Sequence, residues 1–220
     1  MLTAEFFSMF AQGLWETVYV VVLATLFSYI IGLPLGLLLA VTDQDGLRPS
    51  AGVNKVFGTV VNLLRSVPFL IMVFLLTAFT RLIVGTTVGS PAMIPPLVIA
   101  AFPFVARLVE ASVREIDRGV IEAAESMGAS TLQIVTRVIL PEATPSLISG
   151  ATTATVTILG YSAMAGIVGG GGLGAIAINY GYYRKENLTM WVAVVLIVIL
   201  VQILQGLGNR IAARSDKRIR

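Results

Sequence analysis

Three glycines in the second half of the chain, Gly169, Gly171 and Gly174, have the G-x-G-x-x-G spacing found in dinucleotide-binding turns. In such a turn the glycines let the backbone approach a pyrophosphate, but they must follow a β-strand and open a helix. Here they follow a long apolar segment instead, so we predict a sharp turn with close backbone packing. The G-x-x-x-x-G-K-[ST] loop that cradles ATP phosphates does not occur in the sequence. Any ATP used with this chain is therefore expected to be bound by another polypeptide.

The side chains that most enzymes use for catalysis are scarce. Cysteine and histidine are both absent, which excludes disulfides, thiolate chemistry, the usual zinc sites and the commonest general base at neutral pH. Serine and aspartate occur, but we expect no carboxylate in the interior of an apolar span, so no nucleophile and base are expected to meet there. Glu110, near the end of one such span, lies three residues after Arg107 and is expected to form a local ion pair with it at the cytoplasmic boundary. The sequence therefore predicts a protein that is not an enzyme and that holds no metal or cofactor.

The composition is that of a protein surrounded by lipid. Of the 220 residues, 56% are hydrophobic and 12% are charged, whereas about a quarter of an ordinary soluble domain is charged. A helix needs about 20 apolar residues to cross a bilayer core about 30 Å thick. Five apolar runs approach this length, and they occupy residues 18–41, 66–80, 92–113, 146–169 and 188–207. An amphipathic lead-in from Val56 is the expected entry to the second run. We predict an all-α integral membrane protein with five transmembrane helices, in a single domain over residues 1–220 whose core covers about 13–208.

The basic residues predict how the chain lies in the membrane, because Lys and Arg near the ends of spans stay on the cytoplasmic side. Of the 15 Lys and Arg residues, all except Arg81, Arg184 and Lys185 fall on one side of the predicted spans. This pattern places the N-terminus outside, the C-terminus in the cytoplasm and the main cytoplasmic loop at residues 114–141. The net charge of +3 and the short basic tail at residues 210–220 fit a membrane surface better than nucleic acid.

The cytoplasmic loop carries signals for two short helices joined by a tight turn. Asp117 suits the N-cap of the first helix, and Gly128 suits the left-handed position that closes it. Ser130 and Gln133 have the spacing of a capping box that opens the second helix, and Pro141 is expected to end that helix. The loop is thus expected to be ordered.

The same loop resembles the EAA motif of membrane subunits in bacterial ABC importers. The residues that match the motif and its spacing are Glu122, Ala123, Ala124, Gly128, Leu140 and Pro141. In that family the motif forms coupling helices that dock on a separate ATP-binding subunit. The resemblance therefore implies a type I ABC importer transmembrane domain, with coupling helices between the third and fourth spans. Two ordinary capped surface helices would explain Gly128, Ser130 and Pro141, but they would not explain the whole spacing.

Longer segments resemble the methionine uptake subfamily of these importers across nearly the entire chain. They are VNLLRSVPFL, TRLIVGTTVG, the third span with its three prolines, GYSAMAGIVGGGGLG and NYGY. The resemblance implies a homodimeric permease in the bacterial inner membrane, with two ATP-binding subunits that hold ATP and Mg on the cytoplasmic side. It also implies an extracytoplasmic substrate-binding lipoprotein. Methionine is the expected cargo on this resemblance alone.

The predicted path for the solute lies on the axis of a two-fold homodimer, because five spans are few to enclose a path within one chain. A second copy would also cover small-residue faces that pack poorly against lipid. The fourth span brings Tyr161, Ser162 and Met164 close to the glycines, and we predict that these residues line the path. A flexible methionine could close the axis against its symmetry mate. Packing within one protomer is the alternative role for Tyr161 and Met164.

Other functions stay open on the sequence. A permease of the same class could carry another amino acid, a peptide or an osmolyte. A self-sufficient secondary transporter should show internal repeats with interrupted helices in both halves, and we find none in the sequence. The path is also expected to lack buried charge, which argues against proton coupling. Co-purification would separate these classes, because a secondary transporter should be isolated alone.

Overall fold

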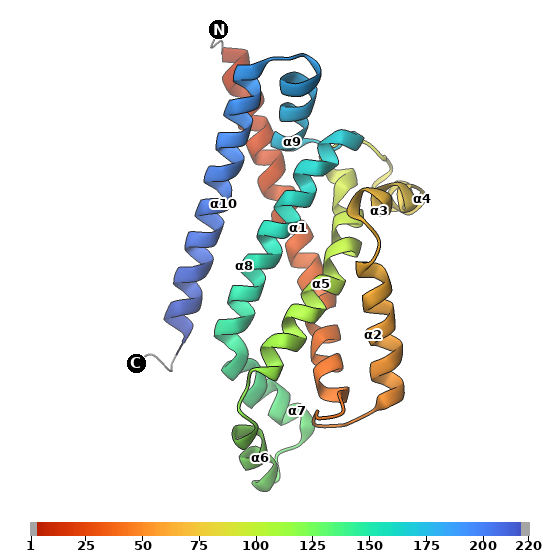
Figure 1. The fold of residues 1–220 in the computed structure, drawn as a ribbon, viewed down its shortest axis with the longest axis vertical. Helices are drawn as coiled ribbons and strands as arrows, with labels where there is room; N and C mark the ends of the chain where they lie inside the picture. The colour runs from red at the N-terminus through yellow and green to blue at the C-terminus, as the bar shows by residue number, and fades with distance from the viewer. Residues whose placement is uncertain (1–3, 217–220) are drawn as a thin grey trace.

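The protein is described here by a computed structural model that covers residues 4–216, and its regular structure over those residues is helical. The elements are α1 (Ala4–Thr42), α2 (Ala51–Arg65), α3 (Phe69–Leu75), α4 (Thr77–Val84), η1 (Ser90–Met93), α5 (Ile94–Arg114), α6 (Arg118–Ser126), α7 (Thr131–Ile134), η2 (Val135–Ile139), α8 (Leu140–Ala165), η3 (Gly166–Val168), α9 (Gly172–Ile176), η4 (Ala177–Tyr183) and α10 (Asn187–Ser215). Figure 1 shows the long helices running roughly along one axis, with the N-terminus at one end and α6 at the other. The predicted all-α fold is confirmed.

Four helical stretches are long and apolar enough to cross a membrane, and α2 with α3 forms a bent pair that brings the number of crossings to as many as five. The four stretches are Ala4–Thr42, Ser90–Arg114, Thr131–Val168 and Asn187–Ser215. They contain the first, third and fifth predicted spans and all of the fourth except residue 169, and each begins before the predicted start. The predicted basic tail reaches residues 217–220, which lie outside the described part of the chain.

The centre of the bundle is the contact between α1 and α5, which lie side by side (Figure 1). Small residues on α1 make this contact close. A Cβ atom at Gly32 would overlap Val105 of α5, and one at Gly36 would overlap Val109. The buried side of α8, which includes Ile158 at 0% exposure, packs on this pair. In contrast, α10 packs mainly on α8 and leaves most of its large apolar side chains exposed, as expected of a helix that faces lipid.

The second predicted span, residues 66–80, is wrong as a single helix, whereas the predicted lead-in from Val56 is confirmed as part of α2. Those residues do not make one helix, because α2 ends at Arg65, α3 begins at Phe69, and the two helices meet at 99°. Pro68 explains the break, since proline has no N–H to donate and restricts the residue before it to extended conformations. The crossing therefore begins with α2, whose Val61 packs against Leu39 of α1 and Ala106 of α5.

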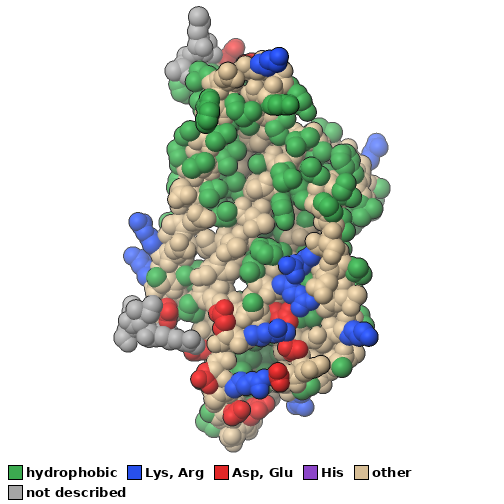
Figure 2. Space-filling model, in the orientation of Figure 1, with side chains coloured by type: hydrophobic (Ala, Val, Ile, Leu, Met, Phe, Trp, Pro, Cys, Tyr) green, Lys and Arg blue, Asp and Glu red, His purple; other side chains and the backbone are tan. Residues whose placement is uncertain are grey.

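Charged side chains are unevenly distributed along the bundle axis. Figure 2 shows Lys, Arg, Asp and Glu gathered in the half of the molecule that contains α6 and α7, whereas hydrophobic side chains dominate the opposite half. The C-terminal end of α10 points towards the charged half, and the N-terminus lies at the far end (Figure 1). The molecule thus has one end suited to water and a long apolar belt.

Glu16 of α1 holds the apolar end of the bundle together. Its Oε2 accepts hydrogen bonds from Ser90 Oγ at 2.7 Å and from the Gly172 backbone N–H at 2.8 Å, and its Oε1 accepts one from Gln12 Nε2 at 2.9 Å. These bonds connect three segments that are far apart in the sequence, α1, η1 and α9. A carboxylate that accepts several hydrogen bonds at once stabilises such a junction more than neutral acceptors would.

The glycines with dinucleotide-like spacing lie at this junction and form a turn, as predicted. Gly169 has φ 86° and Gly172 has φ 80°, a conformation that L side chains rarely adopt. A Cβ atom at Gly174 would overlap the Ala163 carbonyl of α8. The run therefore serves tight backbone packing.

Replacing Glu16 by alanine should destabilise the protein by about 2 kcal/mol, because two donors from distant segments would lose their charged acceptor. The loss should appear as a lower thermal-unfolding midpoint in detergent micelles. Glu5→Ala is the matched control, since it removes the same charge from an exposed position on the same helix. Equal midpoints for the two variants would contradict this role of Glu16.

Candidate functional site

The loop between the third and fourth spans folds as predicted into two helices with local caps. The Asp117 carboxylate accepts a hydrogen bond from the Gly119 N–H at 2.7 Å and caps α6. Gly128 closes α6 with φ 80°. Ser130 and Gln133 form the capping box of α7, with the Ser130 N–H donating to Gln133 Oε1 at 2.8 Å and the Gln133 N–H donating to Ser130 Oγ at 3.4 Å. The sequence therefore specifies an ordered turn here.

One side of this helix pair is anchored to the bundle. Ala124 is 3% exposed and packs in a buried apolar cluster with Ile116 and Ile134. The same cluster includes Ala40 from the end of α1 and Ala143 from the start of α8. The two alanines of the motif thus have different environments, because Ala123 is exposed. A displacement of α6 would be felt directly by α1 and α8 through Ala124.

The other side of the pair exposes large apolar side chains at the charged end of the molecule. Met127 is 82% exposed, Leu132 is 72% exposed and Val120 is 43% exposed. The carboxylate-bearing residue of the motif, Glu122, is exposed beside them. Exposed apolar groups on ordered helices rimmed by charge are typical of a surface that binds another protein. We call Val120, Glu122, Ala123, Met127 and Leu132 the coupling surface.

The predicted end of the second loop helix at Pro141 is wrong. The chain stays helical from α7 through a π turn at Val135–Ile139 into α8, and Pro141 lies in the first turn of α8. A proline is tolerated there because its missing N–H has no required partner after the wider π turn. Leu140 and Pro141 thus join the loop to the fourth span.

The three residues predicted to line a path have different surroundings in the protomer. The ring of Tyr161 stacks on Phe69, the first residue of α3, with centroids 5.0 Å apart. Ser162 is buried and its hydroxyl donates to the Leu159 carbonyl at 2.8 Å. Met164 is 42% exposed. Of the three, Met164 is the side chain most available to a solute or a second copy.

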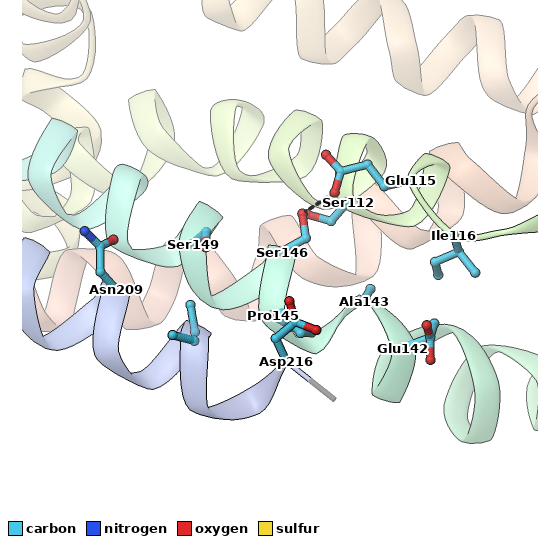
Figure 3. A pocket seen from close by; sticks show the side chains of 12 residues that line it. Ser112, Glu115, Ile116, Glu142, Ala143, Pro145, Ser146, Ser149, Asn209 and Asp216 are labelled. Atoms are coloured by element: carbon cyan, nitrogen blue, oxygen red, sulfur yellow. Dashed lines mark hydrogen bonds between the residues drawn. The ribbon is translucent and has the colours of Figure 1, made fainter. Parts of the chain in front are cut away.

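A polar groove lies between α8 and α10, and the sequence alone did not predict it. Figure 3 shows one of its two pockets, which has a volume of about 540 Å3 and is also lined by Ser112 of α5. In this pocket the Ser146 hydroxyl of α8 lies 2.8 Å from Glu115 Oε2 and 3.0 Å from Ser112 Oγ. A second pocket of about 250 Å3 continues it along the helices and shares Ser149 and Asn209 with the first. We call this combined feature the α8/α10 groove. Within residues 4–216, no group of three or more His, Cys, Asp or Glu side chains could hold a metal ion.

The sequence does contain a signal for this groove, because polar residues recur every four positions on both helices. Ser149, Thr153 and Thr157 lie on one side of α8, and Gln205 and Asn209 lie one turn apart on α10. Polar side chains in a span usually face other protein or water. The hydroxyls of Thr153 and Thr157 donate to backbone carbonyls one turn earlier, at 3.1 Å and 2.9 Å. Their oxygens keep acceptor capacity towards the groove.

The expected ion pair between Arg107 and Glu110, near the end of the third span, is confirmed. Glu110 of α5 is 3% exposed, and it survives burial because each oxygen meets a different arginine. Arg107 Nη1 donates to Glu110 Oε2 at 2.6 Å, and Arg114 Nη2 donates to Glu110 Oε1 at 2.7 Å. Arg114 Nη2 also lies 2.8 Å from Asp43 Oδ2, in the loop after α1. The short-range pairing of Arg107 with Glu110 follows from their spacing, but the burial depends on the packing of distant segments.

Comparison with known proteins agrees with this architecture. Residues 32–220 match the family model described as binding-protein-dependent transport system inner membrane component. The chain is 47% identical over 204 residues to a probable D-methionine transport system permease protein of Vibrio cholerae, covering 93% of this chain and 91% of the relative. It is 47% identical over 181 residues to the methionine import system permease protein of Bacillus subtilis, covering 82% of both chains. A solved structure of a methionine ABC transporter in an inward-facing conformation superimposes with a TM-score of 0.96 at 42% identity, over 98% of this chain and 100% of that one.

Proposed function

The chain belongs to the family of binding-protein-dependent transport system inner membrane components, and we propose that this ABC importer permease moves methionine into the cell. The cargo is supported by relatives at 47% identity whose names specify methionine or D-methionine. The coupling surface is the single observation that carries the proposal, because a self-contained carrier has no use for an exposed apolar surface at its charged end.

The partners follow from the same surface. A separate ATP-binding subunit would dock on the coupling surface and hydrolyse ATP, with Mg, so that this chain itself has no enzymatic role. Two copies of the permease would pair with two such subunits, and a substrate-binding lipoprotein would deliver the solute at the opposite end. Closure of the ATP-binding subunits would draw the coupling helices together and tip the spans between inward-facing and outward-facing states.

The orientation in the inner membrane is part of the proposal. The end that carries α6, α7 and most charged side chains would lie in the cytoplasm together with the C-terminus, and the N-terminus would lie outside. This is supported by the uneven distribution of charge in Figure 2 and by the rule that basic residues stay on the cytoplasmic side.

The test of function is uptake by the assembled complex in vesicles. The chain should co-purify with an ATP-binding subunit, and the complex with its binding protein should accumulate radiolabelled methionine only when ATP is supplied. Competition by other amino acids, short peptides and osmolytes distinguishes the cargo. Isolation of the chain alone would contradict the importer assignment, whereas uptake of a different solute would contradict methionine only.

Met164 would act as a gate on the path. Replacing it by alanine removes the flexible thioether and should raise methionine leak several-fold in vesicles without ATP, because the remaining side chain is too short to close the opening. Met164→Leu nearly preserves the volume and should stay tight. Unchanged leak in Met164→Ala would refute the gate and leave Met164 as a packing residue.

A further inference from the structure

Charged side chains connect three segments, which are the loop after α1, the C-terminal end of α5, and α2. The buried Glu110 joins Arg114 to Arg107, and Arg114 reaches Asp43. Arg107 extends the chain to α2, because its Nη2 donates to Asn62 Oδ1 at 2.8 Å and to the Gly58 carbonyl at 3.3 Å. We call these contacts the α2–α5 clamp. They lie on the last two turns of α2, directly before that helix ends at Arg65.

The contacts of the clamp depend on one another, so that breaking one of them weakens the others. A buried carboxylate is costly unless its oxygens remain paired, and the Glu110 side chain is only 5% exposed between the two arginines. If α2 moved away from α5, Arg107 would lose either Asn62 or Glu110. Since Arg114 is the last residue of α5, with α6 beginning at Arg118, the clamp ties α2 to the root of the coupling helices.

After α2, the chain is held by apolar contacts in place of the charged contacts of the clamp. The 99° break between α2 and α3 falls at residues 66–68, where Ser66 and Pro68 are exposed. Beyond it, α3 packs on α5 through buried apolar side chains such as Val73, and Phe69 stacks on Tyr161 of α8. These apolar contacts can slide more easily than the charge-assisted contacts of the clamp. Hinges in proteins are typically a few residues at the ends of elements.

We propose that Glu110 is a positioning residue that makes α2 move with α5 and the coupling helices, and that residues 66–68 are the hinge about which α2 swings while α3 and α4 stay with the opposite half of the bundle. This inference rests on the proposed importer function. The hinge explains why the second crossing is broken. An unbroken helix would move as one body, so that α3 would follow every movement of α2.

Glu110→Gln tests the clamp in the complete complex with its ATP-binding subunit. Glutamine keeps one acceptor oxygen, so one of the two arginines loses its bond to residue 110 while it keeps its partner on a distant segment. ATP-driven uptake should fall by about ten-fold or more, as expected for loss of a charge-assisted hydrogen bond from the moving state. ATP hydrolysis by the assembled complex should change by less than about two-fold, since the coupling surface is intact. Asp45→Asn is the matched control, because the Asp45–Arg118 pair at 3.3 Å is largely exposed and such pairs contribute little.

Coupled uptake in Glu110→Gln at the wild-type ratio of solute to ATP would overturn the proposal. A parallel fall of hydrolysis and uptake in an assembled complex would also overturn it, because the residue would then support hydrolysis instead of transmission. If Glu110→Gln does not assemble, Asn62→Ala replaces it, since Asn62 is exposed and its loss leaves Glu110 paired. That variant should lower the uptake-to-hydrolysis ratio several-fold.

Spin labels test the hinge directly, and the absence of cysteine from this chain means that the permease itself contributes no competing thiol. Labelled protomers are diluted with unlabelled ones to suppress distances between copies. Between the ATP-free and ATP-trapped states, the distance from Leu63 on α2 to Phe74 on α3 should change, whereas that from Leu63 to Ala111 on α5 should not. All three positions are exposed. A constant Leu63–Phe74 distance in a wild-type complex that transports methionine refutes the hinge alone, whereas a wild-type complex that transports nothing refutes the proposed function.

Discussion

Replacing Gly128 by valine is expected to reduce ATP-driven uptake to background while the protein remains in the membrane. Gly128 has φ 80°, and a side chain in this left-handed region costs about 1–2 kcal/mol, with β-branched residues among the worst. Apart from Gly128 and its two neighbours in the chain, no atom of the described residues lies within 4 Å of the position that a Cβ would take, so the effect comes from the backbone and not from a clash. The turn would open to relieve the strain and would change the angle between α6 and α7. Uptake, ATP hydrolysis and membrane content are the measurements.

Gly85→Val is the matched control for that variant. Gly85 closes α4 with φ 83°, and a Cβ atom added there would likewise meet no atom within 4 Å among residues 4–216, apart from Gly85 and its two chain neighbours. The two substitutions therefore impose the same local strain at opposite sides of the bundle. Uptake should survive Gly85→Val to a large extent. Equal loss in both variants would mean that general destabilisation, and not the geometry of the coupling helices, causes the defect.

The double substitution of Met127 and Leu132 by aspartate should release the chain from its ATP-binding subunit. These side chains are 82% and 72% exposed in the protomer. If a partner buries them, each contributes about 1.5–3 kcal/mol. The sum of about 3 kcal/mol or more corresponds to at least about a hundred-fold in Kd. The carboxylates would add a desolvation cost. Recovery of the ATP-binding subunit in affinity purification, and titration of the purified subunits, measure the change.

Gln44→Asp controls for the added charge, because Gln44 is exposed in the loop after α1 and lies outside α6 and α7. It should leave co-purification unchanged. Normal recovery of the ATP-binding subunit with the double variant would show that the coupling surface is not its docking site.

The parts of this fold that the sequence predicts well are the ones set by local chemistry. The caps at Asp117, Gly128 and Ser130 depend on residues within one turn of each other, so their signals are complete in a short window. The existence of the long spans also follows from composition, because each must present about 20 apolar residues to lipid.

The failures involve segments whose conformation depends on distant neighbours. The stretch at residues 66–80 is apolar enough to suggest a span, but Pro68 turns it and α2 takes over the crossing because Val61 can pack on α1 and α5. Pro141 predicts a helix end, yet the π turn before it lets the helix continue. The two arginines that pair with the buried Glu110 also bind Asp43 and Asn62 from other segments, which no local pattern around α5 contains. The α8/α10 groove could not be predicted, because it depends on how two helices that are far apart in the sequence lie relative to each other.

The π turn joins α7 to α8 without a gap. A rotation of the coupling helices would therefore tilt α8 from its lower end, which lies next to the coupling surface. The 26 residues of α8 span about 39 Å at about 1.5 Å per residue. A tilt of about 10° at the lower end therefore displaces the upper end by about 7 Å, which exceeds the width of a methionine thioether. A small rotation imposed by the ATP-binding subunits would thus produce a large displacement of Met164. The length of α8 determines how far Met164 moves for each degree of tilt.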